Sequence, residues 1–103
     1  SASSELDIDH LVPLKYAWTR GAYNWSKSKR VKFSNDESNL FAVKKSVNRQ
    51  KSAMGPAMWL PPSDNFKCEY IKLFQGIVTK YDLRQADDEL SHINIKMDKF
   101  CVN

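Results

Sequence analysis

Four polar residues in the first half of the chain have the side-chain types that hydrolysis of a phosphodiester bond requires. Asp9 and His10 are adjacent, and Asn39 and Asn48 follow well downstream. A neutral imidazole can take a proton from water near neutral pH, so His10 is a candidate general base. Asp and Asn oxygens suit Mg²⁺, a hard cation that neutralises the charge developing on a phosphate and on its leaving oxygen. The set therefore favours metal-assisted hydrolysis, with a carbonyl group to hold the imidazole in place.

Two short strands and a helix are expected to position these residues. Residues 6–9 alternate apolar and acidic side chains, which predicts a strand that runs on through His10. The apolar run Leu40–Val43 predicts a second strand. Ser46 is a candidate cap for a helix from Val47 to about Lys51. Singly, each polar residue of the set also has a plain structural role in a turn, a cap or a strand end.

The remaining pattern is mostly helical. We expect one helix over Leu14–Arg20, a second over Ala22–Phe33 and a polar loop over residues 34–38. Two longer helices are predicted after the prolines, the first carrying the apolar residues of 70–81 and the second running from Ala86 to Lys99. Their apolar stripes predict that the two helices pack together as a hairpin.

The aromatic residues of the first half leave two interpretations open. Trp18, Tyr23 and Trp25 are interleaved with basic residues, a pattern that fits either stacking on nucleobases or packing in the core. His92, in the last predicted helix, is far from the set in sequence and is expected to be structural or exposed.

Composition and charge narrow the classes of function. The chain has 103 residues, 42% of them hydrophobic and 27% charged, which fits one globular domain over residues 1–103. No apolar run reaches the roughly 18 residues of a membrane span. Residues 11–63 carry ten Lys and Arg against two Asp and Glu, a local excess of eight. Such a segment indicates either a polyanionic partner or a solvated basic face. The basic residues that could line a nucleic-acid path are Lys27, Lys29, Arg30, Lys32, Lys44 and Lys45.

Cys68 and Cys101 are the two cysteines of the chain. They fall at positions that two antiparallel helices would bring together, and a disulfide here would contribute roughly 3–4 kcal/mol. A disulfide would place the protein in a secreted or extracytoplasmic location, whereas two free thiols would fit the cytoplasm. We expect the disulfide.

The ordered set resembles the HNH endonucleases, whose core is the ββα-metal finger. The resemblance extends beyond Asp9-His10, and it is closest to a subfamily of secreted nucleases that also includes the C-terminal part of some modification-dependent restriction enzymes. The segments that carry it are 7–14, Ala17-Trp18, Gly21-Ala22, Asn35-Asp36, Asn39-Leu40, 48–51, 55–57, 59–62, Cys68, Tyr70 and Cys101.

The resemblance implies roles for the four central residues. His10 would be the general base that activates water, and Asp9 and Asn48 would ligate the divalent metal. Asn39 would hold the loop and orient His10 through a backbone contact. The third position of the motif is often His, and Asn48 in its place argues against a site rich in imidazole ligands for a transition metal. The implied metal is Mg²⁺, with Mn²⁺ as the alternative.

Neighbouring residues would take supporting roles. Arg49 and Lys51 would contact phosphates, and Asp7 and Asp36 would support the loop or the surroundings of the metal. The expected fold is α+β, a ββα-metal finger over residues 1–63 with a basic insertion and additional helices, followed by a C-terminal helical hairpin over residues 64–103.

The sequence therefore predicts a monomeric endonuclease that hydrolyses DNA with low sequence specificity, with RNA as the alternative substrate. Three other interpretations stay open. One is a non-catalytic module that binds nucleic acid. Another is a nuclease domain cut from a larger toxin, which would have an immunity protein as partner, or from a restriction enzyme. The third is a purely structural protein, which would neither bind nor cleave nucleic acid.

Overall fold

Two short strands and the helix after the second strand form a ββα unit, which confirms the predicted α+β class. The computed structural model describes residues 5–102. In chain order the elements are β1 (Leu6–His10), α1 (Leu14–Thr19), η2 (Ala22–Asn24), α2 (Lys27–Ser34), η3 (Glu37–Asn39), β2 (Leu40–Lys44), α3 (Lys45–Lys51), α4 (Asp64–Lys80) and α5 (Asp87–Phe100). Within the described part of the chain, no helix has both the length and the apolar character of a membrane span.

Strands β1 and β2 pair antiparallel along their whole length. Leu6 faces Lys44 at one end of the ladder, and His10 faces Leu40 at the other. Because side chains alternate between the two faces of a strand, Asp7 and Asp9 share one face of β1 and His10 lies on the other. Helix α3 follows β2 without a loop and contacts both strands.

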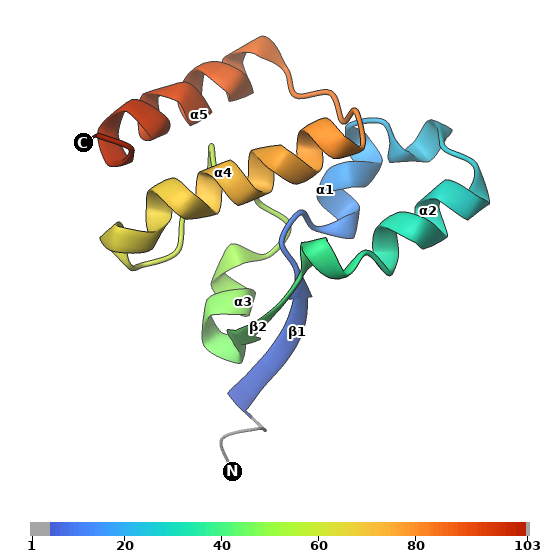
Figure 1. Ribbon diagram of the computed structural model, residues 1–103, viewed down its shortest axis with the longest axis horizontal. Helices are drawn as coiled ribbons and strands as arrows, with labels where there is room; N and C mark the ends of the chain where they lie inside the picture. Colours follow the sequence, from blue (N-terminus) through green and yellow to red (C-terminus); the bar gives the residue numbers. More distant parts are fainter. Residues whose placement is uncertain (1–4, 103) are drawn as a thin grey trace.

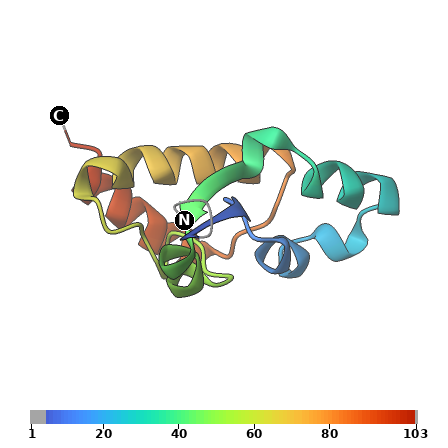
Figure 2. The same cartoon turned by 90° about the horizontal axis from the view of Figure 1, so that it is seen from below.

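Helix α4 is the centre of the fold. It crosses the middle of the molecule, with α5 alongside it and α1 and α2 beyond its other side, while the strands and α3 extend from one edge (Figure 1). The molecule is flat, with extents of 42 × 39 × 20 Å (Figure 2). The buried core joins α4 to the segment just after β1 and consists of Leu11, Val12, Tyr16, Ala17, Ala22, Phe33, Tyr70, Phe74, Ile77, Val78, Tyr81 and Leu83.

Two helical segments differ from the prediction. The helix expected over Ala22–Phe33 is broken into η2 and α2, because the Ser26 hydroxyl accepts a hydrogen bond from the Lys29 amide at 3.1 Å and caps a new helix. The helix expected from Val47 begins at Lys45 instead, and no side chain caps it. The serine that caps a helix is therefore Ser26, inside the segment predicted to be one uninterrupted helix, and not Ser46.

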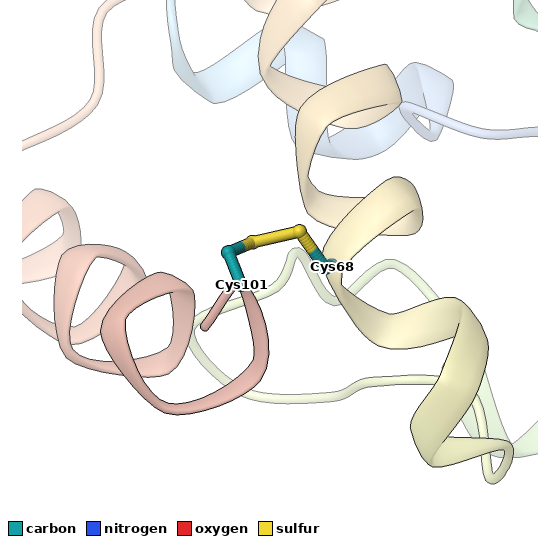
Figure 3. The surroundings of a disulfide bond; sticks show 2 residues. All are labelled: Cys68 and Cys101. Atoms are coloured by element: carbon teal, nitrogen blue, oxygen red, sulfur yellow. A yellow bond between two sulfur atoms is a disulfide. The ribbon is translucent and has the colours of Figure 1, made fainter. Parts of the chain in front are cut away.

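Cys68 and Cys101 form the predicted disulfide, with a Cα–Cα distance of 4.9 Å. Figure 3 shows the bond joining the first part of α4 to the residue after the end of α5. It closes the helical hairpin at the end opposite the turn between the two helices. Disulfides persist in oxidising compartments, so the bond agrees with the extracytoplasmic location expected from the sequence.

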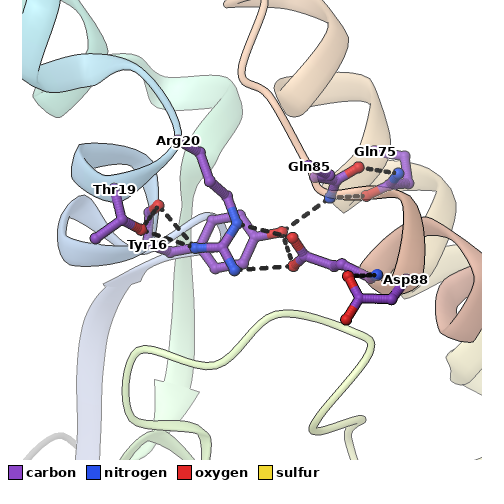
Figure 4. A network of polar contacts seen from close by, with 7 residues as sticks. Tyr16, Thr19, Arg20, Gln75, Gln85 and Asp88 are labelled. Carbon is purple, nitrogen blue, oxygen red and sulfur yellow. Dashed lines mark hydrogen bonds and ion pairs between the residues drawn. The ribbon is translucent and has the colours of Figure 1, made fainter.

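A polar network holds α1 against α5. The Arg20 guanidinium makes a bidentate pair with the Glu89 carboxylate at 2.9 and 3.0 Å, and the Tyr16 hydroxyl donates to the same carboxylate. Gln85 donates to the Tyr16 oxygen at 2.8 Å (Figure 4). Since α1 begins four residues after His10, this network fixes where the chain goes as it leaves the end of β1.

Candidate active site

His10 is the last residue of β1, and its ring is held by a backbone carbonyl. The imidazole Nε2 lies 2.8 Å from the carbonyl oxygen of Ser34. A carbonyl oxygen can only accept a hydrogen bond, so Nε2 must carry the proton. In the neutral ring this leaves the lone pair on Nδ1, which is the arrangement of a general base. Ser34 ends α2, where carbonyl groups have no partner within the helix and are free to accept such a bond.

Asn39 clamps the chain immediately after His10. Its side chain is fully buried, its Oδ1 accepts from the Val12 amide at 2.8 Å, and its Nδ2 donates to the Val12 carbonyl at 3.1 Å. Its own carbonyl accepts from the Leu11 amide at 2.8 Å. The loop-holding role predicted for Asn39 fits these contacts. Asn39 thus contacts the backbone that follows His10, whereas the imidazole ring itself is held by the Ser34 carbonyl.

Asp36 ties the segment between α2 and β2 to the end of α4. Its carboxylate accepts from the Ser38 hydroxyl at 2.6 Å, from the Lys80 ammonium at 2.8 Å and from the Tyr81 hydroxyl at 2.6 Å. The bonds from Lys80, Ser38 and Tyr81 hold the pKa of the Asp36 carboxyl well below its usual range. Burial, together with the bond to Asp36, raises the pKa of Tyr81 to about 12. The segment that carries the Ser34 carbonyl is therefore anchored to the core.

Lys51 is buried beneath the end of β1 and does not lie on the surface where a phosphate contact was predicted. Its side chain is 4% exposed, and its ammonium donates to Asp9 Oδ2 at 2.5 Å and to the carbonyl of His10 at 2.6 Å. Burial lowers the pKa of Lys51, while the Asp9 carboxylate acts in the opposite direction. The prediction for Lys51 is corrected: one ammonium holds both the Asp9 side chain and the backbone of His10.

The oxygen groups expected to bind a metal lie on the α3 side of β1. Asn48 Nδ2 donates to Asp7 Oδ2 at 3.2 Å, and no hydrogen bond engages Asn48 Oδ1 within residues 5–102. Asp9, Asn48 and Lys51 line a cavity of about 180 Å³ that Tyr70 also lines. The Tyr70 hydroxyl is buried there without a hydrogen-bond partner among the described residues. The rest of the cavity lining is mostly apolar, so the groups that suit a hard cation are the free amide oxygen of Asn48 and the second carboxylate oxygen of Asp9.

The chain alone does not build a closed metal site. Among the described residues, no three His, Cys, Asp or Glu side chains gather closely enough to hold a metal by themselves. A metal beside Asp9 and Asn48 would therefore complete its coordination with water or with oxygens of a bound phosphate, which is how Mg²⁺ is commonly held.

The predicted nucleic-acid contacts fall on two surfaces. Lys44, Lys45 and Arg49 surround a shallow hollow at the start of α3. Lys27, Lys29 and Lys32 lie on α2, and Lys29 also lies over the Trp25 ring at 4.6 Å. Arg30 differs from the other basic residues of α2, because its guanidinium donates to the carbonyls of η2 and of the residue after it, at 3.0 Å for Trp25 and 3.4 Å for Ala22 and Tyr23.

The three aromatic residues, for which either core packing or stacking on nucleobases was expected, do not share one environment. Trp25 packs in the core, with ring centroids 5.5 Å from Phe33 and 5.6 Å from Tyr81. Trp18 and Tyr23 are instead about half exposed. His92 is exposed on α5, as expected, and its Nδ1 lies 2.7 Å from the Asp88 carbonyl.

Several contributors could not have been found from sequence. Ser34 acts through its backbone carbonyl, which every residue type shares. Lys80 and Tyr81 reach Asp36 across 44 and 45 residues, and neither belongs to a recognisable motif. The unusual burial of Lys51 has no local signal, since its sequence neighbours are polar and basic.

Comparison with known proteins places the chain among restriction-enzyme domains. Residues 1–93 match the family described as GmrSD restriction endonucleases, C-terminal domain. A protein of Arthroderma benhamiae (strain ATCC MYA-4681 / CBS 112371), described as an uncharacterized secreted protein, is 42% identical over 93 residues. That alignment covers 88% of this chain and 46% of the fungal protein, so the chain spans about half the length of this relative. No solved structure matches the chain.

Proposed function

Because the chain belongs to the family of GmrSD restriction endonuclease C-terminal domains, a nuclease-related family, we propose that it is a metal-dependent endonuclease of the HNH type. Its proposed substrate is DNA, cut with low sequence specificity. Hydrolysis would break the bond between phosphorus and the 3′ oxygen and form a new bond between phosphorus and the oxygen of water.

The observation that carries the proposal is the bond from His10 Nε2 to the Ser34 carbonyl. It fixes the tautomer that leaves Nδ1 able to take a proton, and it holds the ring at the end of β1. Nδ1 accepts the proton of the attacking water as the new bond to phosphorus forms. Two residues hold the parts of the chain that position the imidazole. Asn39 clamps the chain after His10, and Asp36 anchors the segment that contains Ser34.

Asp9 and Asn48 are the residues that would hold the metal, Mg²⁺ or alternatively Mn²⁺. When bound, the cation supplies stabilisation of the negative charge on the phosphate and on the leaving oxygen. Lys51 occupies one carboxylate oxygen of Asp9 and so fixes the direction of the other. Consecutive Cα atoms are about 3.8 Å apart, so a phosphate lying across the end of β1 could be reached from both Asp9 and His10.

We propose low sequence specificity because the exposed basic side chains are suited to contact phosphates, which are the same at every position of a nucleic acid. Lys and Arg that neutralise phosphates give strong, salt-dependent binding that carries no sequence information. We also propose that the protein acts outside the cytoplasm, supported by its disulfide and by the secreted fungal relative.

Plasmid nicking tests the proposal. Supercoiled DNA is incubated with the protein in Mg²⁺, in Mn²⁺ and in EDTA, with single-stranded RNA as a parallel substrate. We expect nicking that needs a divalent metal and is lost in Asp9→Asn and in Asn48→Ala, while both variants keep their DNA binding. A protein that binds DNA but leaves it intact with every metal would instead be a non-catalytic binding module.

A further inference from the structure

An aromatic and basic groove lies beside the proposed catalytic residue and has no part in the hydrolysis described above. It runs between α1 and α2, has a volume of about 470 Å³, and its lining includes Leu14, Trp18, Lys27, Arg30 and Ser34. We call it the α1–α2 groove. Ser34, whose carbonyl holds the His10 ring, lies in its wall, so the groove and the proposed catalytic imidazole share one residue.

The groove exposes large apolar side chains that a small soluble protein would ordinarily bury. Trp18 is 50% exposed, Leu14 48% and Val31 49%. Tyr23 lies edge-on to the Trp18 ring with centroids 6.4 Å apart, and the Arg30 guanidinium lies 5.5 Å from the Trp18 centroid. A half-exposed indole with an arginine beside it offers a flat surface for another ring.

The charge around the groove selects the kind of partner. Residues 11–35 contain no Asp or Glu. The basic residues that line the groove are Lys27 and Arg30. Lys29 and Lys32 lie on the same helix and line a separate hollow. Within the part of the chain that the structure describes, none of the three lysines forms an ion pair, and Arg30 donates to backbone carbonyls. A surface that combines an exposed aromatic ring with unneutralised cations matches a strand of nucleic acid, which has flat bases and a negative backbone. An apolar peptide would match the ring but not the charge.

We propose that the α1–α2 groove binds the substrate strand next to the scissile phosphate, and that Trp18 stacks on one of its nucleobases. This inference rests on the proposed nuclease function and extends it to substrate preference. A base within an intact duplex is already stacked on both faces, so it must be unpaired to lie on Trp18. Single-stranded or locally opened DNA is therefore the preferred substrate.

The test measures binding without cleavage, so that it stands apart from the nuclease proposal. A short fluorescent single-stranded oligonucleotide is titrated with the protein in EDTA, and its anisotropy gives the Kd. Stacking contributes enough per base that Trp18→Ala should weaken binding about tenfold. Trp18→Phe keeps a ring and should lose much less. Ile95→Ala removes an apolar side chain from α5 that is even more exposed, at 64% against 50% for Trp18, and should leave the Kd unchanged.

An abasic oligonucleotide then separates stacking from phosphate contacts. The wild type should bind it about tenfold more weakly than the intact strand, whereas Trp18→Ala should bind both strands equally. If removing the bases costs the same in both proteins, or if Trp18→Ala leaves the Kd of the intact strand unchanged, the proposal is wrong. An intact duplex that binds more tightly than the single strand, with the same loss in Trp18→Ala, would also overturn it. If the protein fails to nick plasmid but Trp18→Ala still weakens oligonucleotide binding as expected, the nuclease proposal is rejected and the binding proposal stands.

Discussion

The buried ion pair between Lys51 and Asp9 gives the most quantitative prediction. Lys51→Met replaces a side chain that is 4% exposed with an apolar one of similar length and leaves Asp9, itself 17% exposed, without a counter-charge. Removing one partner of a buried pair costs about 3–5 kcal/mol. Because Asp9 keeps some access to water, we expect the lower end, about 3 kcal/mol. For a domain of this size that corresponds to a fall in Tm of about 12–24 °C.

Thermal unfolding followed by circular dichroism measures this effect, and two further measurements identify its cause. The double variant Asp9→Asn/Lys51→Met removes both charges and should regain at least half of the lost stability. Millimolar Mg²⁺ should raise the Tm of Lys51→Met more than that of the wild type, since the cation restores a positive charge beside Asp9. A Lys51→Met protein within about 1 kcal/mol of the wild type would refute the buried pairing.

Three further predictions concern the supports of the site. Tyr81→Phe removes one donor from the Asp36 carboxylate, so it should cost about 1.5–3 kcal/mol in urea unfolding and should lower kcat for nicking more than it changes KM. An unaltered kcat in Tyr81→Phe would mean that the contacts of Asp36 do not help to position His10. The depressed pKa of Asp36 adds stability above the unfolded carboxyl's pKa of about 3.9, and this stability is lost as pH falls toward the native value. The Tm of the wild type should therefore fall as the pH is lowered below about 4, and the Tm of Asp36→Asn should fall less steeply. If Tm depends on pH in the same way in both proteins, the contribution of Asp36 to acid stability is contradicted. Reduction of the Cys68–Cys101 bond should cost about 3–4 kcal/mol, read from unfolding with and without dithiothreitol. A cost near zero would mean that helix packing alone closes the hairpin.

Elements with a repeating pattern were predictable from the sequence. The alternation of residues 6–9 and the apolar run at 40–43 predicted both strands, since both patterns are typical of strands. The alternation did not predict which face is covered, because Leu6 and Ile8 are exposed while Asp7 and Asp9 lie on the less exposed face. The stripes of α4 and α5 predicted two helices that pack together, and the spacing of the cysteines then indicated their bond. The break at Ser26 was missed because a serine within a helical pattern is as compatible with an exposed helix position as with a cap.

The sequence predicted which residues belong to the site better than it predicted what those residues contact. Asp9, His10 and Asn48 stand at the end of β1 and on α3, as the order of the residues suggested. The acceptor for His10 is a backbone carbonyl brought from the end of α2 by tertiary packing, and no side chain marks it. For Lys51 the family resemblance implies a phosphate contact, and only the structure reveals that it is buried, with a carboxylate and a carbonyl that compensate its charge.

The most direct test of the central claim compares two histidines under single-turnover conditions. His10→Ala removes the proposed base, and His92→Ala removes the exposed imidazole on α5 as a matched control. With Mg²⁺ and saturating protein, we expect His10→Ala to cut plasmid about 10²–10⁴-fold more slowly than the wild type, with an unchanged Kd for DNA, and His92→Ala to cut normally. A His10→Ala protein that cuts within about threefold of the wild-type rate would contradict the role of His10 as general base.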